Sequence, residues 1–327
     1  MTCEHWKSTL NAGCRTLYER MYYSFKTFKQ EVPCGNADMK SITSTYEAVY
    51  NDHPELFYLS SAPRISQCIG LSGKSDKTIC VDFIFTKSEI KAYQTELKAL
   101  YSSLKSQMLN LSDKDREKVI CDYIVENTTY EINNKYNQNA ATVLFKNKGQ
   151  CSGIAKATKL LLDLFNIESI VLTGEIVDHA TNSIGSHAWN IVKIDNVYYH
   201  LDVTSIIGCN MSKDKPFTYL YYNYSDSQIE NDHKWDRSSV PCCTSSNPDN
   251  DAVEICSLYE LRKLLATTDF SKTSSLEFYS KIPCSSTDVL LNHILSTVKS
   301  VLGQMSQKKR VQIKATGQSI SITFENV

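Results

Sequence analysis

The 327-residue sequence predicts an α+β fold, because its strands are flanked by unevenly spaced helices and do not alternate with them regularly. Hydrophobic residues make up 42% of the chain and charged residues 22%, as in globular proteins, while 11 glycines and 7 prolines are too few for a collagen-like or disordered chain. No apolar run approaches the roughly 18 residues that a membrane helix needs. We therefore expect a soluble protein with one large core or two modest ones.

The charge pattern disfavours two classes of partner. The chain carries 35 Lys and Arg against 36 Asp and Glu, a net charge of −1, without long runs of like charge. We therefore expect neither nucleic acid nor a membrane as a partner. The first thirty residues hold charged side chains where a secretory signal would be apolar, which favours a cytoplasmic location. Twelve scattered cysteines are then expected to be mostly buried thiols and not a disulfide framework.

The first third of the chain is predicted to be mainly helical. Apolar residues from Trp6 to Phe28 recur at steps of three and four, which predicts one helix with a single buried stripe, closed by Pro33 and Gly35. The elements expected next are a helix over residues 41–50, strands over 56–59 and 78–85, a helix over 90–108, and a helix that Ser112 and Asp115 cap and that runs to about residue 126.

The pattern changes at two later places. Beyond Gly149 the long helices give way to one helix followed by several strands, and the polar stretch CTSSNPDND at residues 243–251 predicts a linker. The elements expected after it are a helix over residues 257–267, a strand over 275–281, a helix over 287–305, and strands over 310–316 and 318–324. We expect three regions: an N-terminal helical and mixed α/β region (1–110), a core (111–245) and a small C-terminal α+β domain (246–327).

Cys151 is predicted to open a helix. The segment GQCSG at residues 149–153 precedes an apolar stripe with helical spacing over residues 154–165. At a helix N-terminus the unpaired N–H groups and the macrodipole stabilise an anion, so the thiolate is favoured and its pKa falls. The same N–H groups can donate to the oxyanion of a tetrahedral intermediate. Cys151 is therefore a candidate nucleophile.

Two strands downstream are predicted to form a hairpin. Residues 186–194 and 197–204 flank Asp195-Asn196, a favourable two-residue turn. Counting outward pairs Ile191 with His200 and Trp189 with Asp202, which puts His187 and Asp202 on one face as diagonal neighbours about 7–8 Å apart. The opposite face is largely apolar and is expected to face the core.

The three residues together predict a catalytic site. Cys151, His187 and Asp202 supply a nucleophile, a base and a group that orients the base. In this interpretation Asp202 holds one ring nitrogen of His187 so that the other faces Cys151. His200 shares the face, and we expect it to be a neighbour of the site and not a base.

The motifs GQCSGIAKA (149–157), SHAWNIV (186–192) and YYHLDVT (198–204) resemble those of the transglutaminase-like superfamily, whose core fold is similar to the papain-like cysteine proteases. The flanking segments YNDHPELFYL (50–59) and YYNYSDSQIENDHKWD (221–236) resemble bacterial transglutaminase-like proteins of unassigned substrate. The resemblance covers residues 41–244 and makes the core a transglutaminase-like catalytic domain. It implies that Cys151 is the nucleophile, His187 the general base and acid, and Asp202 the orienting carboxylate.

The sequence departs from the family pattern near the nucleophile. Gln150 matches the residue before the nucleophile in animal transglutaminases, but Ser152 stands where those enzymes have an aromatic residue, and the upstream Trp of their oxyanion hole is missing. Ser205 follows the DVT motif, where bacterial relatives commonly have Trp. We expect Gln150, Ser152 and Trp189 to contribute substrate-binding or oxyanion groups; for Trp189 the alternative is that it covers the hairpin.

The expected function is cysteine-dependent acyl transfer on protein or peptide amide bonds through a thioester. Transfer to water, as in a protease or amidase, is slightly favoured; the alternatives are transfer to an amine, as in a cross-linking transglutaminase, and a non-catalytic binding module. No cofactor or metal is expected, because Cys242 and Cys243 with nearby His233 and Cys209 lack the paired-ligand spacing of zinc sites. The sequence leaves the oligomeric state open.

Overall fold

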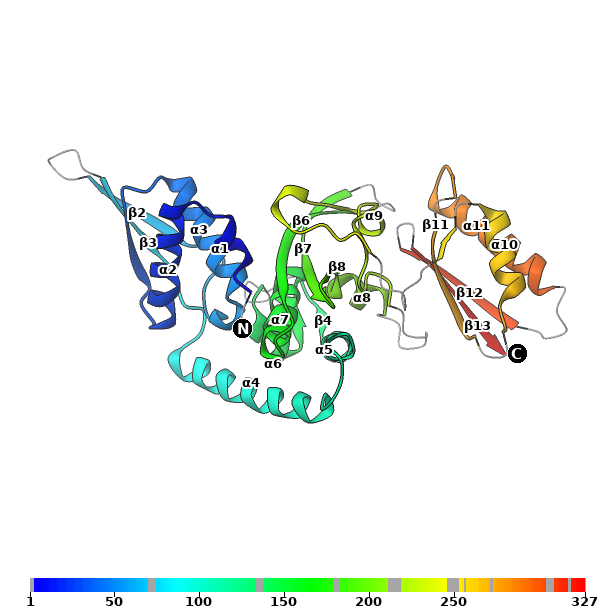
Figure 1. Cartoon of the computed structure of the whole chain (residues 1–327), viewed down its shortest axis with the longest axis horizontal. Helices are drawn as coiled ribbons and strands as arrows, with labels where there is room; N and C mark the ends of the chain where they lie inside the picture. The colour runs from blue at the N-terminus through cyan, green and yellow to red at the C-terminus, as the bar shows by residue number, and fades with distance from the viewer. Residues whose placement is uncertain are drawn as a thin grey trace.

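The computed structural model has an α+β fold, as expected, and is elongated, with the N-terminal helices at one end and the C-terminal helices and strands at the other (Figure 1). The structure describes residues 3–69, 75–132, 138–178, 183–210, 219–245, 253–255, 257–270, 273–280, 282–303, 309–316 and 319–326. None of the helices in these ranges is both long and apolar enough to cross a bilayer. Every cysteine within them is a free thiol.

The N-terminal region packs helices against a three-stranded antiparallel sheet with strand order β1-β3-β2. Its elements are α1 (His5–Thr9), α2 (Ala12–Lys26), β1 (Glu31–Gly35), α3 (Met39–Asp52), the 3-10 helix η1 (Pro54–Leu56), β2 (Arg64–Ile69), β3 (Ser75–Cys80) and α4 (Lys87–Gln107). The single helix predicted from Trp6 to Phe28 is in fact two. Asn11 interrupts it, because its side chain accepts a hydrogen bond from the Cys14 backbone N–H and so caps a new helix.

Three further predictions for this region need correction. Pro33 and Gly35 do not close a helix but lie in β1, and α2 ends at Lys26, shortly before Phe28 with its left-handed φ of 62°. The strand predicted over residues 56–59 is absent, since the chain turns there in η1 and only Leu59 makes an isolated bridge. The strand predicted over residues 78–85 ends at Cys80, and its partner β2 was not predicted.

The helices that lead into the middle region follow the prediction. Thr86 and Glu89 form a reciprocal capping box at the start of α4. Ser112 caps α5 (Asp113–Asn127) by accepting from the Asp115 backbone N–H. Figure 1 shows α4 running from the N-terminal region to α5 beside the middle of the molecule.

The middle region is built on an antiparallel four-stranded sheet with order β8-β7-β6-β9. The elements after α5 are β4 (Thr129–Tyr130), α6 (Ala140–Lys146), β5 (Lys148–Gly149), α7 (Cys151–Leu164), β6 (Ser169–Asp178), β7 (Ser183–Ile194), β8 (Val197–Leu201), α8 (Val203–Cys209), α9 (Asp226–Ile229), β9 (His233–Lys234) and the 3-10 helix η2 (Arg237–Ser239). One continuous hydrophobic cluster joins this region to the N-terminal one: it includes Met21 and Phe25 of α2 as well as Leu161 of α7. The boundary near residue 110 therefore crosses a shared core.

The C-terminal residues form a separate hydrophobic cluster. Helices α10 (Leu258–Thr267) and α11 (Thr287–Leu302) pack on a sheet of order β10-β11-β13-β12, whose strands are β10 (Val253–Ile255), β11 (Ser275–Ser280), β12 (Lys309–Thr316) and β13 (Ser319–Asn326). Both predicted helices and the three predicted strands are present; β10 was not predicted. The predicted linker, residues 243–251, lies outside the described residues beyond Ser245.

Candidate active site

Cys151 is the first residue of α7, as predicted. The helix N-cap is Gln150, whose side chain makes no capping hydrogen bond, so the N–H groups of the first turn are left for other acceptors. Most of α7 is buried from Gly153 to Leu162, whereas Cys151 and Ser152 are only partly buried. The nucleophile candidate therefore sits where a buried helix reaches the surface.

Small side chains bring α7 close to the sheet. Ala155 of α7 packs with Ala188 of β7 and Val171 of β6, and Cys151 lies against this cluster. The Ala188 backbone N–H donates to the Cys151 sulfur, as does that of Ser152. Close approach of a helix and a strand needs such small residues, because larger ones would hold the two backbones apart.

The pKa of the Cys151 thiol lies below its ordinary value although the thiol is partly buried. Burial acts to raise it, but the hydrogen bond and charge of His187 and the N–H groups of Ala188 and Ser152 outweigh that effect. The neighbouring Tyr130, whose strand β4 pairs with Gly149, has its pKa raised by burial and then by the negative charges of Cys151 and Asp202. The negative charge of Cys151 therefore raises the pKa of Tyr130 as well as that of His187.

The hairpin that carries His187 forms in the predicted register. Ile194 pairs with Val197 and Ile191 with His200, and Asp195 and Asn196 both have left-handed φ angles of 50° and 65°, as a type I′ turn requires. Both faces of β7 are nevertheless buried from His187 to Val192. The apolar face packs on α7, as expected, and aromatic residues that include Trp235 cover the other face as well.

Asp202 occupies a different backbone position from the one predicted. Strand β8 ends at Leu201, so the predicted pair of Trp189 with Asp202 does not form. Asp202 is instead the N-cap of α8, and its Oδ1 accepts from the Ser205 backbone N–H at 3.1 Å. The physical reason is that aspartate satisfies the free N–H groups of a helix start, which competes with the extended conformation.

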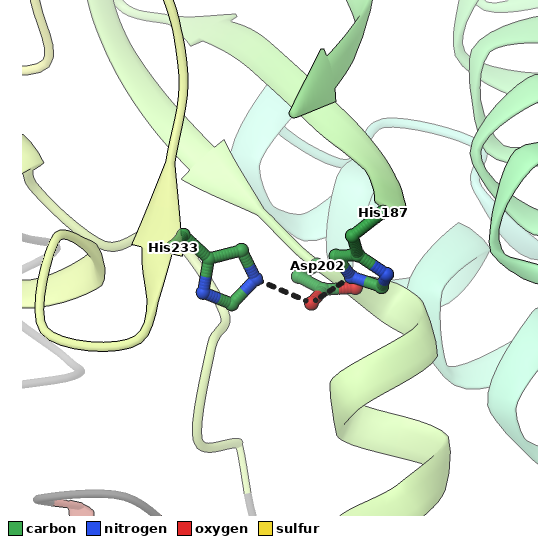
Figure 2. A group of neighbouring side chains, drawn as sticks. All are labelled: His187, Asp202 and His233. Carbon is green, nitrogen blue, oxygen red and sulfur yellow. Dashed lines mark hydrogen bonds and ion pairs between the residues drawn. The ribbon is translucent and has the colours of Figure 1, made fainter. Parts of the chain in front are cut away.

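The predicted contact between His187 and Asp202 is present all the same. His187 Nε2 lies 2.8 Å from Asp202 Oδ2, as Figure 2 shows, and the Asp202 side chain is fully buried. Since Nε2 is bound to the carboxylate, Nδ1 is the nitrogen left for the hydrogen bond with Cys151. Burial alone would lower the pKa of His187, but Asp202 and the Cys151 thiolate raise it to about 10. The pKa of Asp202 is lowered by His187 and by His233, against the effect of burial.

His233 also binds Asp202, and the sequence reasoning missed this contact. Its Nε2 lies 3.1 Å from Asp202 Oδ2 and its Nδ1 lies 2.6 Å from Asp232 Oδ1 (Figure 2 shows the first of these). Tyr221 donates its O–H to the far oxygen of Asp232 at 2.5 Å. Both His233 and Asp232 belong to the segment 221–236 that resembles the family's flanking sequence, but no spacing rule connects them to Asp202.

The remaining predicted site residues divide into two groups. Gln150 and Ser152 flank Cys151 at the partly exposed start of α7; Gln150 bonds to Gln138, and the Ser152 Oγ accepts from the buried Lys156 Nζ at 3.0 Å. Trp189, by contrast, is 1% exposed and stacks on the His187 ring at 5.8 Å. The expectation that it binds substrate therefore needs correction: its indole covers the hairpin and supports His187 from the inside.

Among the described residues, two groups of side chains have their possible metal ligands within 4.8 Å of one another: His187 with Asp202 and His233, and His200 with Asp226 and Cys243. In the second, the Trp189 N–H donates to His200 Nδ1 at 2.9 Å, so the His200 proton is on Nε2, which donates to Asp226 at 2.8 Å. A metal-bound histidine shows the opposite pattern, with its second nitrogen donating. This group fits a buried hydrogen-bond network, with His200 as the neighbour that was predicted.

One comparison with known proteins identifies a defined segment of the chain. The family model described as the transglutaminase-like superfamily matches residues 102–203, a range that includes Cys151, His187 and Asp202. No curated protein matches the chain.

Three solved structures that resemble the chain are distant from it in sequence. One described as a "TGase" is 17% identical, with a TM-score of 0.32, and the match covers 50% of this chain and 48% of that one. A "Putative Cysteine Protease from Cytophaga hutchinsonii" is 16% identical, with a TM-score of 0.30, over 46% of this chain and 65% of that one. A protein from Parabacteroides distasonis described as a "putative protease" is 12% identical, with a TM-score of 0.25, over 81% of this chain and 62% of that one. The chain thus spans about half to two thirds of each of these chains.

Proposed function

We propose that this chain, whose residues 102–203 match the model of the transglutaminase-like superfamily, is a cysteine-dependent acyl-transfer enzyme acting on protein or peptide amide bonds. One observation carries the proposal. A partly exposed cysteine at the start of a buried helix is hydrogen-bonded to His187, whose other ring nitrogen is 2.8 Å from the buried Asp202 carboxylate. This arrangement supplies a thiolate, a proton carrier and a group that fixes the carrier's tautomer.

In the first half of the proposed reaction, Cys151 Sγ attacks the amide carbonyl carbon and forms a C–S bond. The carbonyl oxygen becomes an oxyanion, for which the free N–H groups at the start of α7 are donors. The C–N bond then breaks as His187 passes its Nδ1 proton to the departing nitrogen. The products are a free amine and a thioester on Cys151, and His187 is left neutral.

In the second half, His187 takes a proton from the incoming nucleophile, which attacks the thioester carbon. The C–S bond breaks and the Cys151 thiolate is restored beside protonated His187. We propose water as the acceptor, which makes the product a carboxylic acid. An amine acceptor, giving a cross-linking reaction, is the alternative, because the same base position activates either nucleophile.

The nucleophile assignment is tested by alkylation at pH 7 with limiting iodoacetamide, followed by mass spectrometry of each cysteine. Burial raises the pKa of the Cys34, Cys121 and Cys243 thiols, whereas that of Cys151 is lowered, so we expect Cys151 to react first. The exposed Cys68 is the internal control for simple accessibility. Equal labelling of Cys68 and Cys151 would favour the third candidate, a non-catalytic binding module.

The acceptor is tested separately. We expect incubation with an unlabelled peptide library to give acyl adducts on Cys151 and released carboxylic acids. Addition of a labelled primary amine together with a glutamine-containing protein separates the two outcomes. Label incorporated into the protein would replace hydrolysis by transamidation as the proposed reaction. A Cys151→Ala protein is the blank for both measurements.

A further inference from the structure

His233 is held between two carboxylates. Its Nε2 lies 3.1 Å from Asp202 Oδ2, its Nδ1 lies 2.6 Å from Asp232 Oδ1, and its side chain is fully buried. An ionised carboxylate can only accept hydrogen bonds, so both ring nitrogens of His233 must carry a proton to make these two contacts. The geometry therefore corresponds to a buried imidazolium.

The backbone fixes His233 in this position. Strand β9 pairs with β6, where His233 lies opposite Ile176, and the Val177 N–H donates to the Asp232 carbonyl at 2.7 Å. Gly174 of β6 leaves room for this strand, because a Cβ there would lie 2.2 Å from the Lys234 carbonyl oxygen. Because Gly174 has no side chain, β9 can approach β6 closely enough to bring His233 to the site.

Few other titratable groups of the described residues lie around His233. Asp202 and Asp232 face its two nitrogens, the His187 ring centroid is 5.3 Å away and the Tyr221 ring is 5.7 Å away. Burial lowers the pKa of His200, and the nearby charge of His233 adds to that effect. Burial would lower the pKa of His233, but the two carboxylates outweigh that effect and raise it. Tyr221 donates to Asp232 and so holds it as an acceptor.

We propose that His233 is a positioning residue of the active site: as a buried cation it fixes the Asp202 oxygen that His187 binds, and it keeps His187 able to release its proton. The inference rests on the proposed function, because the proton concerned is the one that His187 gives to the leaving amine. Asp202 alone would hold a protonated His187 very firmly. A second cation that shares the same carboxylate oxygen opposes protonation of His187 and so makes His187 a better acid.

The expected size follows from the separation of the two rings. At 5.3 Å, and with the effective dielectric constant of about 20 that suits protein sites, loss of the His233 charge should raise the His187 titration midpoint by roughly two pH units. The comparison is best made in a Cys151→Ala background. There the thiolate no longer raises the His187 midpoint, so the transition falls in an accessible pH range.

The test is an NMR titration of the His187 ring in three full-length proteins, Cys151→Ala alone and with either His233→Gln or His200→Gln. We expect the midpoint to rise by roughly two pH units with His233→Gln and to stay within a few tenths with His200→Gln. His200 is the matched control, since it is a buried histidine of the same aromatic cluster that does not touch Asp202. An unshifted midpoint with His233→Gln, or an equal rise with His200→Gln, would overturn the proposal.

A measurement on the unaltered protein guards against a His233→Gln protein that fails to fold. In the ¹⁵N spectrum at pH 7 we expect both His233 ring nitrogens to be protonated, and one unprotonated nitrogen would overturn the imidazolium assignment. These readouts do not need catalysis. If Cys151-dependent turnover is absent while the His187 midpoint still shifts, the proposed function fails and the electrostatic role of His233 stands. If turnover is present but the midpoint does not shift, the proposed function stands and the role of His233 fails.

Discussion

Replacing Gly174 by alanine should displace the strand that carries His233. A Cβ at this position would lie 2.2 Å from the Lys234 carbonyl oxygen and 2.8 Å from the Trp189 ring, where ordinary contacts begin at 3.4 Å. Strand β9 must therefore retreat by about 1 Å, because a backbone carbonyl cannot swing aside as a flexible side chain can. Such a movement would stretch the 3.1 Å bond from His233 to Asp202 beyond hydrogen-bond range.

The expected cost of Gly174→Ala is about 1–3 kcal/mol in the free energy of unfolding, as for other overpacked sites. Thermal unfolding measures this cost, and NMR of the His187 ring reports whether the displaced His233 has lost its influence. Gly185→Ala is the matched control: Gly185 lies on the adjacent strand β7, and a Cβ there would meet nothing within 4 Å. Unchanged stability and an unchanged His187 titration in Gly174→Ala would refute the reasoning, as would equal damage from Gly185→Ala.

Three other substitutions probe the site and its support. Cys151→Ala should leave thermal unfolding almost unchanged and abolish turnover; retained turnover would contradict the nucleophile assignment. Asp202→Asn should lower turnover by about 10³–10⁴-fold, because the orienting charge for His187 is lost, and kcat within tenfold of the parent would count against this role. Glu117→Gln should stabilise the protein by up to about 3 kcal/mol at pH 8 and much less at pH 4.5, measured by urea unfolding. The reason is that burial raises the pKa of Glu117 from 4.5 to about 7, so stability falls as pH rises between those values; an equal gain at both pH values would contradict it.

The parts of the site that follow local rules were predictable from sequence. The start of α7 at Cys151 follows from the apolar stripe behind it, and the hairpin register follows from the Asp195-Asn196 turn. Each depends on residues within a few positions of one another. That range is the one over which backbone preferences and side-chain periodicity act.

Errors arose where two local preferences compete. Asn11 can continue a helix or cap a new one, and it caps. Asp202 can extend a strand or cap α8, and it also caps. The contact with His187 is present despite this second error, and Asp202 directly follows β8, which pairs with the strand that carries His187. The prediction that Trp189 binds substrate failed for a different reason. Periodicity indicates which face a residue occupies but not what covers that face, and Trp189 is buried.

The sequence alone determined that a cysteine begins a helix and that a histidine follows it on a hairpin strand, because both features depend on local patterns of residues. The pairing of β9 with β6, which brings His233 to Asp202 across 31 residues of chain, was decided only by the tertiary structure. The physical reason is that a pairing between distant strands depends on how the whole sheet closes and on the space that one glycine leaves, and no short-range preference encodes either of these.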